Sequence, residues 1–103
     1  MKINDIATRE DVIEVLKTVI DPEIFVDVWT LGLIYNIDLH PETAVLKITM
    51  TFTSMGCPAG PQLVEEIRSK TAQLHGVQKS EVEVVFRPPW QPSDELKAIL
   101  GLS

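Results

Sequence analysis

The chain contains a single cysteine, Cys57, among its 103 residues. One cysteine excludes a disulfide within the chain, and it also excludes a mononuclear metal site built only from cysteines of one chain. A lone free thiol fits a reducing compartment, and residues 1–5 lack the apolar core of a secretion signal. We therefore expect a cytoplasmic protein.

Basic residues are also scarce: 9 Lys and Arg stand against 15 Asp and Glu, which gives a net charge of −6. They form no cluster of the kind that binds nucleic-acid phosphates, so we expect no nucleic-acid partner. No apolar run approaches the length of a membrane span, and we expect no membrane partner. The 5 glycines are scattered and form no phosphate-cradling loop. What is left is a single small acidic domain over residues 1–103, whose hydrophobic content of 45% supplies a modest core.

Hydrophobic periodicity predicts the order of the secondary-structure elements. Residues 33–39, 44–53 and 77–87 alternate between apolar and polar side chains, as half-buried strands do. Residues 8–20 and 61–75 carry apolar side chains at helical spacing, and a short third helix is predicted near the carboxyl end. We predict fold class α/β (α+β): one small domain with element order α-β-β-α-β-α and a three-stranded mixed sheet with the helices packed on one face.

Cys57 lies where the second strand pattern stops and the second helical pattern begins. That helix should begin near Pro58 or Pro61, because proline is accepted in the first turn of a helix. Cys57 would then lie at a helix N-terminus, where unpaired N–H groups and the positive end of the dipole lower the pKa of a thiol. A thiolate is both a nucleophile and a metal ligand. The residue pattern leaves a second interpretation open, in which Cys57 is a small buried hydrophobe.

Residues 21–30 combine acidic side chains with large apolar ones. Asp21, Glu23 and Asp27 lie among five apolar residues, which a fully solvated loop would not need. We expect this segment to pack against the domain and to hold carboxylates near a chemical site. The alternative is that Asp21 and Glu23 only cap backbone groups or lie in solvent.

Short motifs follow one another along nearly the whole chain: Asp-Pro-Glu at residues 21–23, Asp27, Leu-Gly-Leu-Ile-Tyr at 31–35, Thr-Phe-Thr-Ser at 51–54, Cys-Pro at 57–58 and Pro-Pro-Trp at 88–90. This ordered set resembles the SufT/PaaD-like iron–sulfur cluster assembly family. The resemblance implies a small α/β domain similar to the carboxy-terminal domain of NifU scaffolds. It also implies a role in maturing iron–sulfur proteins, through a SUF-type pathway or as an accessory to a particular oxygenase. Cys57 matches the family's motif cysteine, Asp21 and Glu23 match its acidic motif, and Thr53 matches a position usually occupied by threonine.

The number of thiolates limits what such a role can be. An iron–sulfur cluster usually has four protein ligands, mainly thiolates, and one chain offers only Cys57. We therefore expect no tightly bound cofactor, whereas a transient cluster or iron at Cys57 is chemically allowed, with Asp21 or Glu23 as a hard ligand that favours release. The resemblance implies an adaptor or transient carrier, not an enzyme, whose partners are the iron–sulfur assembly machinery and client apoproteins. A homodimer would offer two thiols, and the sequence leaves the oligomeric state open.

Two other functions remain open from the sequence. A cysteine-independent interaction module, dedicated to a multicomponent oxygenase, would use a partner surface around Trp29 and Trp90, because aromatic residues are enriched at binding hot spots. A cysteine-nucleophile enzyme would need a base beside the thiol. His40 lies in a predicted turn and His75 at the far end of the second predicted helix, so neither is well placed as a base or expected to bind a metal.

Overall fold

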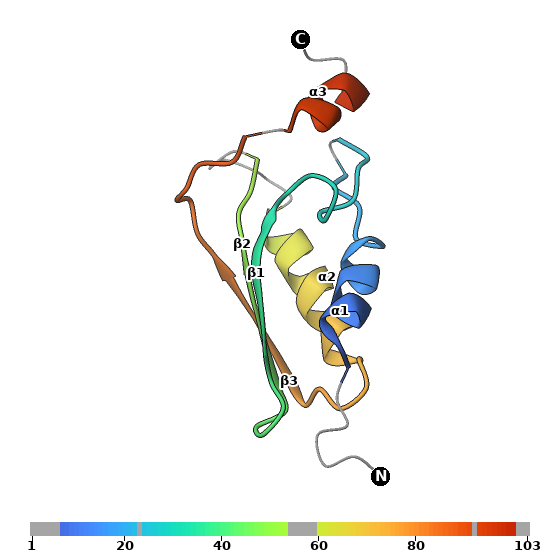
Figure 1. Ribbon diagram of the computed structural model, residues 1–103, viewed down its shortest axis with the longest axis vertical. Coiled ribbons are helices and arrows are strands. Elements are labelled where there is room, and N and C mark those ends of the chain that lie inside the picture. Colours follow the sequence, from blue (N-terminus) through green and yellow to red (C-terminus); the bar gives the residue numbers. More distant parts are fainter. Residues whose placement is uncertain (1–6, 23, 54–59, 92, 101–103) are drawn as a thin grey trace.

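The computed structural model describes residues 7–22, 24–53, 60–91 and 93–100. Within these residues the chain forms three helices and three strands in the predicted order α-β-β-α-β-α (Figure 1). The elements are α1 (Arg9–Leu16), β1 (Ile34–His40), β2 (Val45–Met50), α2 (Gly60–Ala72), β3 (Lys79–Val84) and α3 (Asp94–Leu100).

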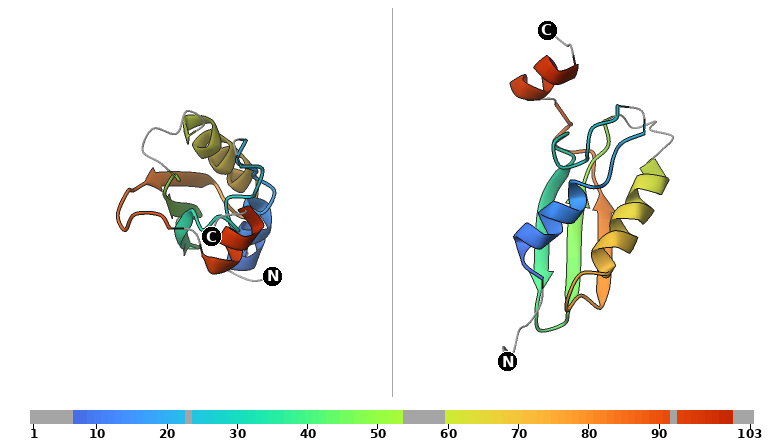
Figure 2. Two further views of the ribbon diagram at one scale, coloured as in Figure 1. Left: turned by 90° about the horizontal axis from the view of Figure 1, so that it is seen from above. Right: turned by 90° about the vertical axis from the view of Figure 1, so that its right-hand side faces the viewer.

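The strands form one mixed sheet in the order β1-β2-β3, as predicted. β1 and β2 are antiparallel, whereas β2 and β3 are parallel. A parallel pair requires a crossover connection, which α2 provides. α1 and α2 cover one face of the sheet (Figure 2), and α3 lies beyond its end (Figure 1), where its Leu96 is buried. Two of the three described helices therefore form the layer that closes the core.

The core lies between the sheet and the two helices α1 and α2. Three alternate residues of β2 are fully buried: Leu46, Ile48 and Met50. They belong to one cluster with buried side chains of both helices, which are Val12, Leu16, Leu63 and Ile67. On the opposite face of the sheet, exposed Lys47 of β2 pairs with Asp38 of β1 and Glu81 of β3. The alternation in the sequence thus correctly predicts which face of β2 is buried.

The first helix is shorter than its sequence pattern predicts. Thr8 caps α1 through a capping box with Asp11, but the helix ends at Leu16 and not at Ile20. Ile20 instead forms an isolated bridge with Asp27 and is 45% exposed. The prediction that Ile20 belongs to the apolar stripe of this helix is therefore wrong, because the chain leaves helical geometry before reaching it.

The second helix and the third strand also end earlier than predicted. α2 begins at Gly60, between the two prolines that the sequence marks as its start, and ends at Ala72 instead of His75. β3 ends at Val84, and Phe86 beyond it is 39% exposed. Among the helices in the described ranges, none has the length and apolarity that crossing a membrane requires.

Candidate functional site

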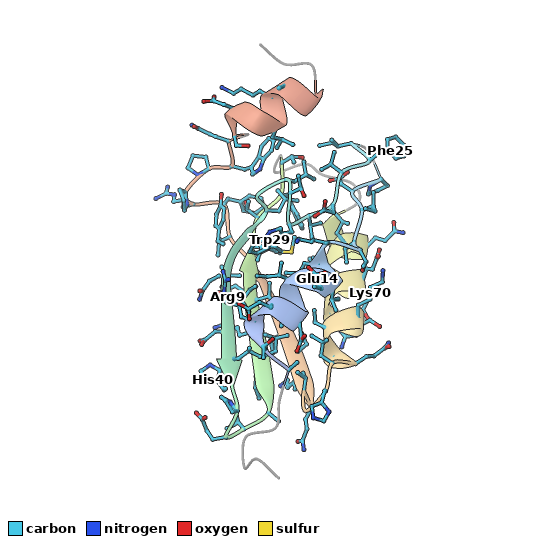
Figure 3. All side chains as sticks on the ribbon, turned by 45° about the vertical axis from the view of Figure 1, so that its right-hand side comes forward. Arg9, Glu14, Phe25, Trp29, His40 and Lys70 are labelled. Atoms are coloured by element: carbon cyan, nitrogen blue, oxygen red, sulfur yellow. The ribbon has the colours of Figure 1, made fainter. Side chains whose placement is uncertain are left out.

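The segments that carry the predicted site residues gather at one end of the sheet. At this end β2 finishes, α2 begins and α3 is found (Figure 1). The α1–β1 loop, residues 17–33, and the segment 85–91 reach the same end. His40 marks the opposite end, where β1 turns into β2 (Figure 3).

Phe52 and Gly60 bring together the two chain segments on either side of residues 54–59. A Cβ atom built on Gly60 would lie 2.6 Å from Cε2 of the Phe52 ring, far inside van der Waals contact. The first residue of α2 is therefore a glycine because the ring occupies the space of a side chain. Cys57 lies between these two residues in the sequence and outside the described residues. Its position at a helix N-terminus stays a prediction, and α2 begins three residues after it.

A second aromatic ring extends this junction toward β3. The rings of Phe52 and Phe86 meet edge to face, with 6.1 Å between centroids and 68° between planes. Just before Phe86, the N–H of Val85 donates to the carbonyl of Met50 at 2.8 Å. Thr53, which the sequence singles out, directly follows Phe52 and is half-buried. Two aromatic rings therefore connect the first residue of α2 with the segment that follows β3.

Asp21 has a structural task in the α1–β1 loop. Its side chain is only 2% exposed, and its Oδ1 accepts a hydrogen bond from the N–H of Ile24 at 3.3 Å. Its own N–H donates to the carbonyl of Val26 at 3.0 Å, and its carbonyl accepts from the N–H of Phe25 at 2.8 Å. These contacts support the interpretation that Asp21 caps backbone groups. A ligand role for Asp21 remains a prediction, and Glu23 lies outside the described residues.

The two tryptophans are half-buried and already engaged within the domain. The guanidinium of Arg9 lies 5.8 Å from the centroid of the Trp29 ring (Figure 3), at a distance typical of a cation–π contact. The indole N–H of Trp90 donates to the carbonyl of Leu31 at 2.6 Å. Trp90 is thus only partly exposed, and its hydrogen bond links the segment 85–91 to the α1–β1 loop. The role of both residues as a partner surface stays a prediction.

A hollow of about 420 Å³ lies where the segment 85–91 crosses to β1. Its lining consists of Gly32, Tyr35, Pro88, Pro89, Trp90 and Gln91. The strand pattern predicts Tyr35 on the apolar face of β1, but a shift of register between Ile34 and Asn36 leaves it as an extra residue. Its hydroxyl donates to the carbonyl of Pro88 at 2.7 Å. Two motifs of the sequence, at residues 31–35 and 88–90, supply five of the six lining residues, but the sequence alone did not predict a hollow.

The donors of the described side chains do not form a metal centre by themselves. Within the described ranges, no group of three or more His, Cys, Asp or Glu side chains is arranged to hold a metal ion. His40 contacts Asp38, with 3.0 Å between Nε2 and Oδ2, at the end of the sheet where β1 turns into β2 (Figure 3). A metal site with three or more such ligands would therefore need at least one ligand from beyond the described residues.

The chain matches a family model over most of its length. The model, described as iron–sulfur cluster assembly protein, covers residues 9–84, which run from the start of α1 to the end of β3.

Three curated proteins are similar in sequence. The Fe-S protein maturation auxiliary factor YitW of Bacillus subtilis is 44% identical over 84 residues, which cover 82% of this chain and 81% of YitW. The Fe-S protein maturation auxiliary factor SufT of Staphylococcus aureus is 41% identical over 88 residues, which cover 82% of this chain and 99% of SufT. An iron–sulfur cluster carrier protein of Deinococcus radiodurans is 31% identical over 87 residues, which cover 82% of this chain but 24% of that protein.

Solved structures share the fold. A conserved hypothetical protein of Thermotoga maritima superposes with a TM-score of 0.80 at 37% identity, covering 93% of this chain and 96% of the other. A domain of unknown function from Bacillus anthracis superposes with a TM-score of 0.79 at 36% identity, covering 91% and 92%. The predicted fold class is therefore confirmed.

Proposed function

Because the chain belongs to the iron–sulfur cluster assembly protein family, we propose that it acts as an auxiliary factor in the maturation of iron–sulfur proteins. The observation that carries this proposal is the match to two maturation factors at 44% and 41% identity over most of both chains. Its partners are then the iron–sulfur assembly machinery and client apoproteins.

The finer proposal is that Cys57 holds iron or a cluster only in passing, as cargo. A single thiolate per chain leaves most ligand positions of a cluster to other groups, so the complex is labile and suited to transfer. The start of α2 three residues after Cys57 supports this, because free N–H groups at a helix N-terminus stabilise a thiolate nearby. The similarity to an iron–sulfur cluster carrier protein supports it too.

We also propose that the protein is not an enzyme that uses Cys57 as a nucleophile. Such a site needs a base within hydrogen-bonding reach of the thiol. His40 lies at the opposite end of the sheet (Figure 3). His75 follows the far end of α2, a helix of 13 residues and thus about 20 Å long. Neither described histidine is placed to activate a thiol near the start of α2.

Anaerobic reconstitution tests the carrier proposal. The wild-type protein, Cys57→Ala and the control His40→Ala are incubated with ferrous iron and sulfide and then desalted. We expect iron, acid-labile sulfide and visible absorption to be retained by the wild type and by His40→Ala, and to be lost in Cys57→Ala. Equal retention in Cys57→Ala would show that Cys57 is not the ligand. Retention in none of the three would contradict the carrier proposal and leave the adaptor role.

A further inference from the structure

The α1–β1 loop holds Phe25 outside the domain. The side chain is 78% exposed, the highest value among the exposed large apolar side chains in the described part of the chain. Figure 3 shows the ring projecting from the loop, away from the sheet and the helices. One exposed apolar side chain is unremarkable by itself, but the backbone that carries Phe25 is unusual.

The backbone at Phe25 is in the left-handed region, with φ at +64°. Glycine adopts this region readily and asparagine does so at moderate cost, whereas a bulky residue adopts it rarely. Phe25 therefore costs the fold backbone strain, while its exposed ring gains little of the hydrophobic stabilisation that burial would bring. A position that served only to turn the chain would favour Gly or Asn.

The loop fixes this unfavourable conformation with several contacts. The N–H of Phe25 donates to the carbonyl of the buried Asp21, whose own N–H donates to Val26. Oδ1 of Asp21 accepts from the N–H of Ile24, and Ile20 and Asp27 form a bridge that closes the loop. Strain that the surroundings over-determine in this way is typical of functional positions. A ring presented by a fixed loop also loses little conformational entropy when it binds.

We propose that Phe25 is a docking anchor that inserts into an apolar pocket, bordered by basic residues, on a protein partner in iron–sulfur maturation. The pocket follows from the ring, because aromatic anchors that fill a desolvated pocket contribute most of the affinity at many interfaces. The basic border follows from the net charge of −6. A second copy of the chain or an anionic lipid surface would repel this charge, whereas a basic border attracts it and accelerates association. The identity of the partner rests on the function proposed above; the anchor rests on the loop.

A matched pair of glycine substitutions tests the anchor. Ala44 is the second described non-glycine residue with a positive φ, +58°, and it lies at the β1–β2 turn, at the opposite end of the sheet. Phe25→Gly and Ala44→Gly should both raise the urea midpoint, by about 0.5 M, because glycine relieves the strain. The variants are then expressed in cells that lack the chromosomal copy of this protein's gene, and the cluster content of a [4Fe–4S] dehydratase is measured. We expect the cluster content restored by Phe25→Gly to be at most one fifth of that restored by the wild type. Ala44→Gly should restore it within twofold of the wild type, and Phe25→Leu should restore it partly.

Several results would overturn the docking inference. Full restoration by Phe25→Gly would show that the ring is dispensable. A lower urea midpoint for Phe25→Gly would show that the ring stabilises the fold. If wild-type and deletion cells contain equally loaded dehydratase, the proposed function fails and the inference fails with it. If the wild type restores loading and Phe25→Gly does so equally, only the docking inference fails.

The kind of partner is tested by placing a photo-crosslinking benzoylphenylalanine at position 25. We expect a crosslink to a different protein, whose purified form binds Phe25→Gly at least tenfold more weakly than the wild type, with Ala44→Gly unchanged. A crosslink only to a second copy would assign the ring to self-association. Phe25-dependent binding to phosphatidylglycerol vesicles would assign it to a membrane. Both results would overturn the inference.

Discussion

A carboxylate removed from water needs hydrogen-bond donors, and Asp21 finds one in the backbone of its own loop. Its Oδ1 accepts a hydrogen bond from the N–H of Ile24. Its backbone N–H donates to the carbonyl of Val26, and its backbone carbonyl accepts from the N–H of Phe25. The Asp-Pro-Glu motif can be recognised in the sequence because its three residues, 21–23, are consecutive. The sequence could not decide between capping and metal binding, because that choice depends on which groups surround the folded carboxylate.

Substitution of Asp21 separates these two roles. We expect Asp21→Ala to lower the free energy of unfolding by about 1 kcal/mol, because it leaves the partly buried N–H of Ile24 without its acceptor. Asp21→Asn keeps an acceptor oxygen and should lose less. Urea denaturation measures both. An Asp21→Ala variant with wild-type stability that no longer retained iron on reconstitution would show that the carboxylate is a ligand and not a cap.

Phe25 shows where residue-level reasoning from the sequence fell short. A loop rich in apolar residues is expected to pack against the domain, and Val28 of the same loop is indeed fully buried. Phe25 is 78% exposed because the bonds of Asp21 set the backbone direction at that point. Such a direction depends on φ at one residue, which composition does not reveal.

At the scale of elements, the type and the buried face of an element were predicted well where a pattern repeats along that element. The buried face of β2 follows from strict alternation over successive residues. Element ends were predicted less well, because tertiary contacts set them. The pattern of α1 continues to Ile20 in the sequence, yet the bridge between Ile20 and Asp27 takes the chain out of the helix. Likewise, Tyr35 leaves the alternation of β1 and bonds Pro88, 53 residues away.

The contact between Phe52, two residues after β2, and Gly60, the first residue of α2, gives a prediction about stability. Alanine is a better helix former than glycine, by about 0.5–1 kcal/mol. We nevertheless expect Gly60→Ala to lower the free energy of unfolding by about 1–3 kcal/mol, because its Cβ would overlap the Phe52 ring.

A double variant provides the control for this prediction. In Phe52→Leu the smaller side chain leaves room, so adding Gly60→Ala to it should cost much less stability than in the wild type. Urea or thermal denaturation of the four proteins completes the cycle. A stability gain in Gly60→Ala alone would contradict the close packing of helix start and ring.

At the scale of the whole molecule, the two ends of the sheet differ in character. One end carries the β1–β2 turn and His40, whereas the other gathers the end of β2, the start of α2 and the Asp21 loop (Figures 1 and 3). The family motifs, scattered from residue 21 to residue 90 in the sequence, belong to segments that reach the second end. The exposed ring of Phe25 lies in a loop at this end, so the proposed docking belongs to the second end of the sheet.

The iron content of a client protein tests the proposed role in iron–sulfur maturation most directly. A [4Fe–4S] protein is purified anaerobically from cells without this protein, and from the same cells supplied with the wild type or with Cys57→Ala. We predict that the client loses at least half of its iron per polypeptide in the absence of the protein, regains it with the wild type and does not regain it with Cys57→Ala. Equal iron content in all three clients would contradict a role in iron–sulfur maturation.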